Sequence, residues 1–326
     1  MRLGIDTFSL RSQGWTAFQI VDYAAGLELE NVHFSERAHI GDIETSNLEA
    51  VREYANQRNL TLEIGMRSFN RLSPTFDPAL GSGEQQLIDM VAAAEIVGSP
   101  IVRCFAGMQA DRLVSGGFEA YFEESVRALK AAASHAEAAG IAIAVENHGG
   151  VDFLASELVE LIEAVGSTHV RICLDTGNPP YAAEDAVYAA DILAPYVVTC
   201  HLCDTHVWLT PDGAMAQWVP AGRGSLDIPR IASILKTHAP DVPLDIEEIT
   251  GGAPKLIPIY DQDSEFWQLY PDMKAPALAR FLATAQKKSE QFEPVSSATS
   301  PEVAQREYFE ESVRFVKSAL AGTEKQ

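Results

Sequence analysis

The chain has 326 residues, of which 47% are hydrophobic, so it is long enough to bury one large core. Its 24 basic and 46 acidic residues give a formal net charge of −22, which repels nucleic-acid phosphates and anionic membrane surfaces. No apolar stretch reaches the roughly 18 residues that cross a bilayer, and the chain begins directly with a strand-like run, so we expect a cytoplasmic protein without a nucleic-acid or membrane partner.

Short runs rich in β-branched residues alternate with amphipathic stretches of about ten to twenty residues, a pattern typical of βα units around a buried parallel sheet. Eight such units predict a closed (β/α)8 TIM barrel over residues 1–290. The predicted strands are Leu3–Ser9, Asn31–Glu36, Thr61–Arg67, Ile101–Gly107, Ile141–His148, Val170–Gly177, Val197–Thr205 and Val242–Ile249. The predicted helices between them are Thr16–Leu27, Ser46–Arg58, Glu84–Val97, Phe118–Ala139, Ser156–Val165, Glu184–Leu193 and Ile228–Lys236.

An open, doubly wound sheet is the competing α/β architecture, and it often has a Gly-rich phosphate loop after the first strand. Here Ile5-Asp6-Thr7-Phe8-Ser9 continues without a GxGxxG motif, and Gly222-Arg223-Gly224 is an isolated GxG between two later elements. The sequence therefore favours the closed barrel over a nucleotide-binding open sheet.

The segment after the eighth strand, Thr250–Lys274, is long and contains three prolines and four aromatic residues. Long connections at the carboxyl ends of barrel strands usually shape the active-site mouth, so we expect a cover or an oligomer contact. The eighth helix is predicted at Pro276–Lys287. Residues 291–326 are predicted to hold a linker with a hinge at Pro294–Pro301 and an additional C-terminal helix, Val303–Leu320, which packs on the barrel wall or on a partner subunit of a homo-oligomer.

The four cysteines each lie in a run rich in Val, Ile and Leu, which indicates buried thiols rather than a disulfide framework. Cys200 and Cys203 have the spacing of a CxxC zinc or redox motif. In an extended strand, however, these two positions point to opposite faces, and the sequence has no second CxxC to complete a zinc site.

Four late strands end in residues that bind metal ions, and in a TIM barrel the chemistry gathers at these ends. Because side chains alternate between faces, each of the four can point to the barrel axis. Three carboxylates and one imidazole suit one divalent ion, Mn²⁺ or Mg²⁺, with Co²⁺ or Zn²⁺ as alternatives. A single acid could instead cap a helix or pair with an arginine, but four consecutive inward strand ends favour a metal site. The predicted ligands are Glu146, Asp175, His201 and Glu247.

These strand ends also carry recognisable motifs: Val145-Glu146-Asn147-His148, Leu174-Asp175-Thr176-Gly177-Asn178, His201-Leu202-Cys203-Asp204 and Ile246-Glu247-Glu248-Ile249-Thr250-Gly251. Together they resemble the successive motifs of the xylose-isomerase-like TIM-barrel superfamily, also called the sugar phosphate isomerase/epimerase family. The resemblance covers about residues 1–290. It does not specify a substrate, because the superfamily includes ketose epimerases, hydroxypyruvate isomerase, inosose dehydratase, keto-sugar lyases and decarboxylases, and apurinic endonucleases.

The resemblance implies that Glu146, Asp175, His201 and Glu247 are the metal ligands. In the epimerase branch the two glutamates also form the acid/base pair, so Glu146 and Glu247 would be catalytic, one removing a proton beside a carbonyl while the metal stabilises the enediolate. Glu248 is the rival ligand on the eighth strand. Glu247 is preferred because it matches the family ending and shares its strand face with Asp245.

Several residues near these ends are predicted to bind substrate, and each has a structural alternative. His148 shares the face of Glu146 and is expected to bind a hydroxyl or move a proton, rather than cap a loop. Asn178 holds a sugar hydroxyl or shapes a turn before Pro179-Pro180. Arg103 clamps an anionic group or pairs with inward acids. Asp204 and His206, just past His201, are substrate contacts or support the ligands.

Arg223 marks a departure from the family, where this segment often reads Gly-Glu-Gly ahead of a helix. Here it reads Pro220-Ala221-Gly222-Arg223-Gly224-Ser225-Leu226-Asp227. A cation over the mouth favours an acidic substrate such as a sugar acid, or it offsets the surplus of carboxylates.

The function predicted from these features is a divalent-metal-dependent isomerase or epimerase of a small sugar or keto-sugar, acting through a metal-stabilised enediolate. The alternative is a metal-dependent carbon–oxygen or carbon–carbon lyase: a decarboxylase of an oxo sugar acid, or an eliminase of a keto-sugar or 3-oxo-glycoside. The endonuclease branch uses more metal-binding histidines and a basic groove, which a net charge of −22 opposes. A barrel retained as an interaction subunit is the non-enzymatic alternative.

Overall fold

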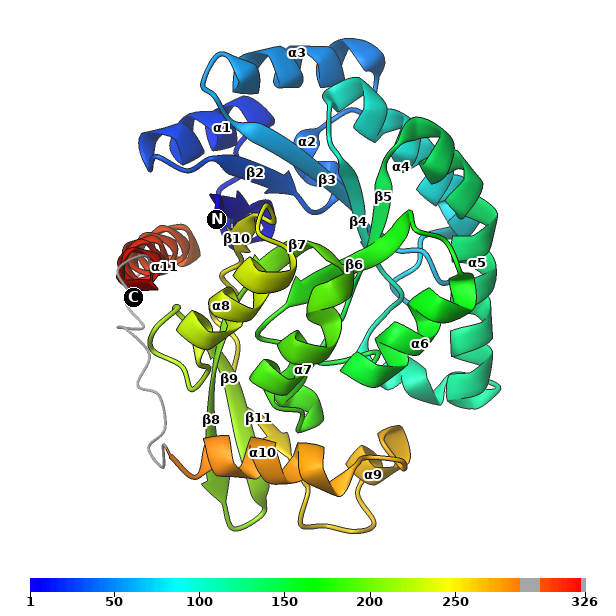
Figure 1. The fold of residues 1–326 in the computed structure, drawn as a ribbon, viewed down its shortest axis with the longest axis vertical. Coiled ribbons are helices and arrows are strands. Elements are labelled where there is room, and N and C mark those ends of the chain that lie inside the picture. Colours follow the sequence, from blue (N-terminus) through cyan, green and yellow to red (C-terminus); the bar gives the residue numbers. More distant parts are fainter. Residues whose placement is uncertain (288–299, 324–326) are drawn as a thin grey trace.

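The computed structural model describes residues 1–287 and 300–323 and shows a closed barrel of eight parallel strands surrounded by helices (Figure 1). The order around the barrel is β1-β10-β7-β6-β5-β4-β3-β2, so chain neighbours are barrel neighbours and β10 closes the ring against β1. The predicted (β/α)8 TIM barrel is therefore confirmed. The barrel strands are β1 Leu3–Asp6, β2 Asn31–Phe34, β3 Thr61–Ser68, β4 Ile101–Phe105, β5 Ala142–Glu146, β6 Val170–Asp175, β7 Val197–Leu202 and β10 Leu244–Ile246.

Several helices begin or end at capping residues of the sequence. At the start of α1, the Thr16 hydroxyl accepts the N–H of Gln19, and the Gln19 side chain accepts the N–H of Thr16. At the end of α5, Gly140 adopts the left-handed conformation with φ 68°. The helices are α1 Ala17–Gly26, α2 Arg37–Ile40, α3 Thr45–Asn56, α4 Gly83–Val97, α5 Gly117–Ala139, α6 Ala155–Val165, α7 Ala186–Leu193, α8 Ile228–His238, α9 Glu265–Leu269, α10 Ala275–Ala285 and α11 Pro301–Thr323.

The main hydrophobic core lies between the barrel and its helices. The β-branched residues of the strands pack there against Ala, Leu and Ile side chains of the helices, as expected of a parallel sheet covered by helices. The four cysteines are buried free thiols, which confirms the prediction from their surroundings in the sequence. The barrel interior is different, because several strands present polar and charged side chains there.

Seven of the eight predicted strands end two or three residues earlier than predicted, and two of them show why. The first stops at Asp6, because the Asp6 Oδ1 accepts the N–H of Phe8 at 2.8 Å and turns Thr7–Leu10 into a 3₁₀ helix. The run Val197–Thr205 contains two elements: the barrel strand β7 ends at Leu202, and a second strand, β8, covers Asp204–Thr210. The β-branched character of the run continues across this break, so composition alone did not reveal it.

A small antiparallel sheet at the carboxyl end of the barrel was missed by the sequence analysis. It consists of β8, β9 Gly213–Val219 and β11 Lys255–Ile257, in the order β11-β9-β8. Gly213 lets β11 approach, because a Cβ at this position would lie 2.2 Å from the carbonyl oxygen of Ile257. The strand β11 and the helix α9 come from Thr250–Lys274, the segment predicted as a cover, and with the hairpin they enclose a second hydrophobic cluster.

The C-terminal helix α11 packs on the barrel wall beside α1 and α8, near the N-terminus (Figure 1). Phe309, Val313 and Val316 are buried in the main core. Residues 294–299 of the predicted hinge lie outside the described residues, and the division at residue 290 stays a prediction. Within residues 1–287 and 300–323, no helix has the length and apolar character needed to cross a membrane.

One buried acid outside the barrel interior, Glu184, should make the stability of the fold depend on pH. Glu184 is 4% exposed, its carboxylate accepts the N–H of Ala155 at 3.2 Å, and burial raises its pKa from 4.5 to about 8. The native state therefore holds this proton at pH values where the unfolded chain has released it. The contribution of Glu184 to the free energy of unfolding is fully present below pH 4.5 and is lost as the pH rises towards 8.

We expect Glu184→Gln, which keeps an acceptor but cannot ionise, to gain stability relative to the wild type between pH 5 and 8, by at most about 1.4 kcal/mol per pH unit. Chemical denaturation at a series of pH values measures this difference. Glu160→Gln, on the exposed face of α6, is the matched control and should show no such slope. A difference for Glu184→Gln that is constant over the range would contradict the expectation.

Candidate active site

Four side chains converge at the carboxyl ends of β5, β6, β7 and β10. One donor atom from each lies within 4.8 Å of the others, and all four residues are buried. The barrel register creates this closeness, because Asp175 on β6 is directly paired with His201 on β7. The four residues predicted as metal ligands thus share one small volume: Glu146, Asp175, His201 and Glu247.

The imidazole of His201 forms the centre of this group. Its Nδ1 lies 3.2 Å from Glu146 Oε2 and 3.3 Å from Glu247 Oε2. Within the part of the chain that the structure describes, His201 Nδ1 and Glu146 Oε1 are buried and make no hydrogen bond. Buried polar atoms without partners are costly, and a hard set of three carboxylates and one imidazole would satisfy them around a divalent cation. The donor set therefore fits a divalent metal ion.

Asp175 is fixed by backbone groups on one side and faces the cluster on the other. Its Oδ1 accepts the N–H groups of Gly177 at 2.8 Å and Asn178 at 2.7 Å, while Oδ2 lies 3.4 Å from Cys203 Sγ. Burial, with Glu247 and Glu146 nearby, raises the pKa of Asp175 well above its usual value. Without a cation, these carboxylates repel one another.

Arg103, predicted to clamp an anionic group or pair with inward acids, pairs with Glu146 through its Nε. It also donates to the carbonyl oxygens of Ser35 and Met66 at 3.3 Å each. Burial alone would raise the pKa of Glu146, but Arg103 and His201 hold it well below the usual range. Arg103 therefore keeps Glu146 ionised inside the barrel.

The consecutive glutamates after β10 point in different directions. The Glu247 carboxylate joins the cluster, whereas Glu248 is hydrogen-bonded by Ser312 of α11. Ser312 also accepts the N–H of Ala221 at 2.8 Å, which ties α11 to the segment before α8. The geometry therefore places Glu247, and not its rival Glu248, beside the other three predicted ligands.

A cavity of about 270 Å³ opens beside the cluster and is lined by Glu146, Glu247, Arg103, His148 and Asn178, together with aromatic side chains. The His148 ring stacks on Phe105 with centroids 3.7 Å apart. Its Nδ1 lies 2.9 Å from the Gly107 carbonyl oxygen, which can only accept, so Nδ1 carries the hydrogen. The neutral ring therefore keeps Nε2 as an unprotonated acceptor for a ligand in the cavity.

Asn178 also lines this cavity, and its Oδ1 accepts the N–H of Gly150 at 3.1 Å. The other three residues predicted as substrate contacts are not among the cavity's lining residues. Asp204 Oδ2 accepts the N–H groups of Gly222 and Gly224 at 2.9 Å each. His206 stacks on Trp208 with centroids 5.2 Å apart, and Arg223 Nη2 lies 2.6 Å from Glu311 Oε2 of α11. Their predicted substrate roles stay predictions.

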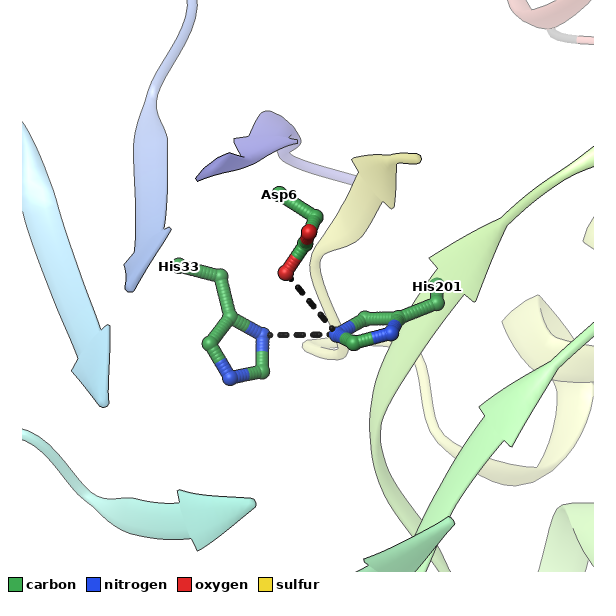
Figure 2. A group of neighbouring side chains, drawn as sticks. All are labelled: Asp6, His33 and His201. Atoms are coloured by element: carbon green, nitrogen blue, oxygen red, sulfur yellow. Dashed lines mark hydrogen bonds and ion pairs between the residues drawn. The ribbon is translucent and has the colours of Figure 1, made fainter. Parts of the chain in front are cut away.

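The sequence analysis missed a second polar group deeper in the barrel, formed by the early strands. Asp6 on β1, His33 on β2 and Glu63 on β3 stand side by side in the register. His33 Nδ1 lies 3.1 Å from His201 Nε2, and Asp6 Oδ2 lies 3.4 Å from the same nitrogen (Figure 2). Asp245, two residues before Glu247, lies with its Oδ2 3.7 Å from His33 Nδ1.

A signal for this group was present in the sequence. Asp6 and His33 are ligand-type residues, but they lie within the predicted strands Leu3–Ser9 and Asn31–Glu36 rather than at the predicted strand ends. Burial lowers the pKa of His33 from 6.5 to about 4, so this imidazole is neutral near pH 7.

Comparison with known proteins places the chain in a structural context. A family model described as "Xylose isomerase-like TIM barrel" matches residues 12–269. No sequence among the curated proteins matches the chain significantly.

Several solved structures share the fold. D-psicose 3-epimerase from Clostridium cellulolyticum H10 is 14% identical, with 98% of this chain and 99% of that chain covered and a TM-score of 0.66. The IOLI protein with a binding zinc atom is 16% identical, with 88% and 96% covered and a TM-score of 0.60. The probable 3-DHS dehydratase AsbF from Bacillus anthracis is 16% identical, with 88% and 100% covered and a TM-score of 0.56.

The adjacent glutamates provide a matched test of the ligand set. We expect Glu247→Gln to bind Mn²⁺ at least about tenfold more weakly than the wild type, because it removes a charged donor atom from the cluster. Glu248→Gln, whose side chain faces Ser312, should keep wild-type affinity. Isothermal titration of metal-stripped protein measures both. Equal Mn²⁺ affinity of Glu247→Gln and wild type would exclude Glu247 as a ligand.

Proposed function

The chain belongs to the xylose isomerase-like TIM barrel family, and we propose that it is a divalent-metal-dependent isomerase or epimerase of a small sugar or keto-sugar. One observation carries this proposal. Glu146 and Glu247, on strands separated by β6 and β7, approach the same His201 nitrogen at 3.2 and 3.3 Å and line one cavity. Such a pair can hold a cation and also exchange protons with a bound substrate.

The proposed cofactor is one divalent ion held by Glu146, Asp175, His201 and Glu247, with Mn²⁺ as the first choice and Mg²⁺, Co²⁺ or Zn²⁺ as alternatives. An ion there would polarise a substrate carbonyl and stabilise negative charge on its oxygen. The IOLI protein, which has the same fold, was solved with a zinc atom. The names of the epimerase structures support a sugar as the substrate.

The residues around the cavity have separate proposed roles in proton transfer, substrate binding and shielding from water. Glu146 and Glu247 are the proposed acid/base pair for a proton beside the substrate carbonyl. His148 presents Nε2 to a substrate hydroxyl, and its stacking on Phe105 and bond to Gly107 fix the ring. The apolar walls formed by Phe8, Phe105, Trp218 and Ile249 exclude water from the reacting carbon.

A second candidate function is a lyase, and a specific feature supports it. A second cavity of about 370 Å³ shares the lining residues Glu36, Arg67 and Thr75 with the first, so the two lie side by side along this edge of the barrel. Met66 and Met90 contribute an apolar wall to it. This space would accept a group attached to the sugar, as in a 3-oxo-glycoside, and its loss by elimination would use the same base and the same metal-stabilised charge.

The experiment that separates these functions is incubation of the Mn²⁺-loaded protein with panels of keto-sugars, oxo sugar acids and 3-oxo-glycosides in D₂O. Isomerisation or epimerisation should place deuterium on the carbon beside the carbonyl without loss of a substituent. Release of CO₂ or of the attached group would identify the lyase instead. Absence of any product or exchange, in protein shown to contain metal, would overturn both proposals.

His148 offers a direct test of a substrate role once a substrate is found. Asn in its place can still donate to the Gly107 carbonyl but lacks an acceptor at the position of Nε2. We expect His148→Asn to lower kcat about 10²- to 10⁴-fold, the range typical of a lost general acid or base, while bound Mn²⁺ stays at the wild-type level. Steady-state kinetics and metal analysis measure the two. An unchanged kcat would leave His148 without a catalytic role.

A further inference from the structure

The two nitrogens of His201 face different surroundings. Nδ1 faces Glu146 and Glu247, on the side of the cavity, at 3.2 and 3.3 Å. Nε2 faces the barrel interior, where His33 Nδ1 lies at 3.1 Å and Asp6 Oδ2 at 3.4 Å (Figure 2). Asp6 and His33 form the inner group, and their side chains and that of His201 are fully buried. The His201 imidazole thus lies between Glu146 and Glu247 on one side and the pair of Asp6 and His33 on the other.

We propose that Asp6 and His33 are positioning residues, which hold His201 through Nε2 so that Nδ1 is presented as the metal-binding atom. The inference rests on the proposed function, because it assumes that the four-residue cluster holds a divalent ion. A neutral imidazole that binds a metal through Nδ1 carries its hydrogen on Nε2. That hydrogen then needs an acceptor, and the inner pair supplies it.

His33 accepts this hydrogen through Nδ1, at a distance normal for such a bond. Asp6 adds a negative charge beside the same Nε2–H. Its Oδ1 accepts the N–H of Phe8 at 2.8 Å, which fixes the carboxyl group and leaves Oδ2 towards His201. Within residues 1–287 and 300–323, Asp6 Oδ2 is buried and meets no hydrogen-bond partner, and it lies 3.4 Å from His201 Nε2.

The backbone fixes the relative placement of the pair. Asp6 and His33 are register partners on β1 and β2, so their side chains project from neighbouring points of the barrel wall. Behind His33, Glu63 Oε2 lies 3.5 Å from Nδ1 and is itself held by the Thr199 hydroxyl at 2.6 Å. The ring of His33 is therefore confined by the barrel and needs no rearrangement to support His201.

The test is Mn²⁺ affinity measured by calorimetry on metal-stripped protein, which needs no substrate. We expect His33→Leu, which removes the acceptor, to bind Mn²⁺ about 10- to 100-fold more weakly, the effect typical of a lost partner of a ligand histidine. His33→Asn, which returns an acceptor oxygen near the position of Nδ1, should recover most of the affinity. His39→Leu removes a histidine whose Nδ1 lies 2.7 Å from the Thr7 hydroxyl, away from His201, and it should bind Mn²⁺ like the wild type.

The outcomes separate this inference from the function on which it rests. A wild type that binds no Mn²⁺ would overturn the proposed function and the inference together. Equal affinity of wild type and His33→Leu would overturn the inference alone. Two Mn²⁺ ions per wild-type chain, with one lost in His33→Leu, would make the inner group a ligand set and would also overturn the inference.

A measurement on the wild type covers the case in which His33→Leu does not fold. In Zn²⁺-loaded protein labelled with ¹⁵N-histidine, we expect His33 to carry its hydrogen on Nε2 and His201 to carry its hydrogen on Nε2 as well. NMR spectra that correlate ring nitrogens with ring hydrogens identify these forms. A hydrogen on His33 Nδ1 would overturn the inference, since that nitrogen could not then accept from His201.

Discussion

Burial of carboxylates inside the barrel is the constraint on which the rest of the structure depends. An ionised acid in such a place costs several kcal/mol unless it is paired or hydrogen-bonded. Arg103 offsets the charge of Glu146, and burial raises the pKa of Glu63 and of Asp245 to about 7 each, so that protons offset part of the remainder. The acids of this interior are Asp6, Glu63, Glu146, Asp175, Asp245 and Glu247. A divalent ion would complete the compensation.

Room for these groups comes from small residues on the inner wall. A Cβ at Gly4 would lie 1.9 Å from Asp245 Oδ1, so only glycine leaves that carboxylate its place. Ala144 and Cys173 are likewise small and buried between β4 and β7, on the strands that carry two of the predicted ligands. Side-chain volume on the strands therefore decides where polar groups fit, while the β-branched residues facing the helices maintain the barrel itself.

Most of the fold could be predicted because its signals are local. Each barrel strand is a short β-branched run, each main helix has an amphipathic repeat, and alternation along the strands brought Glu146, Asp175, His201 and Glu247 to one axis. The β8-β9-β11 sheet could not be predicted, because β11 pairs with residues about 40 positions earlier in the chain and its three residues carry little local pattern. The partners of Arg223 and Glu248 lie on α11, and no local pattern reveals such distant contacts.

The bond between Glu248 and Ser312 also limits the order in which parts of the protein can fold during synthesis. The two residues are 64 positions apart, and Glu248 directly follows Glu247. During synthesis on the ribosome, the last barrel strand therefore emerges well before the helix that holds its far end. Glu248 can gain this contact only after those further residues have left the exit tunnel. The contact between the segment after β10 and α11 therefore forms only after all eight barrel strands have been synthesised.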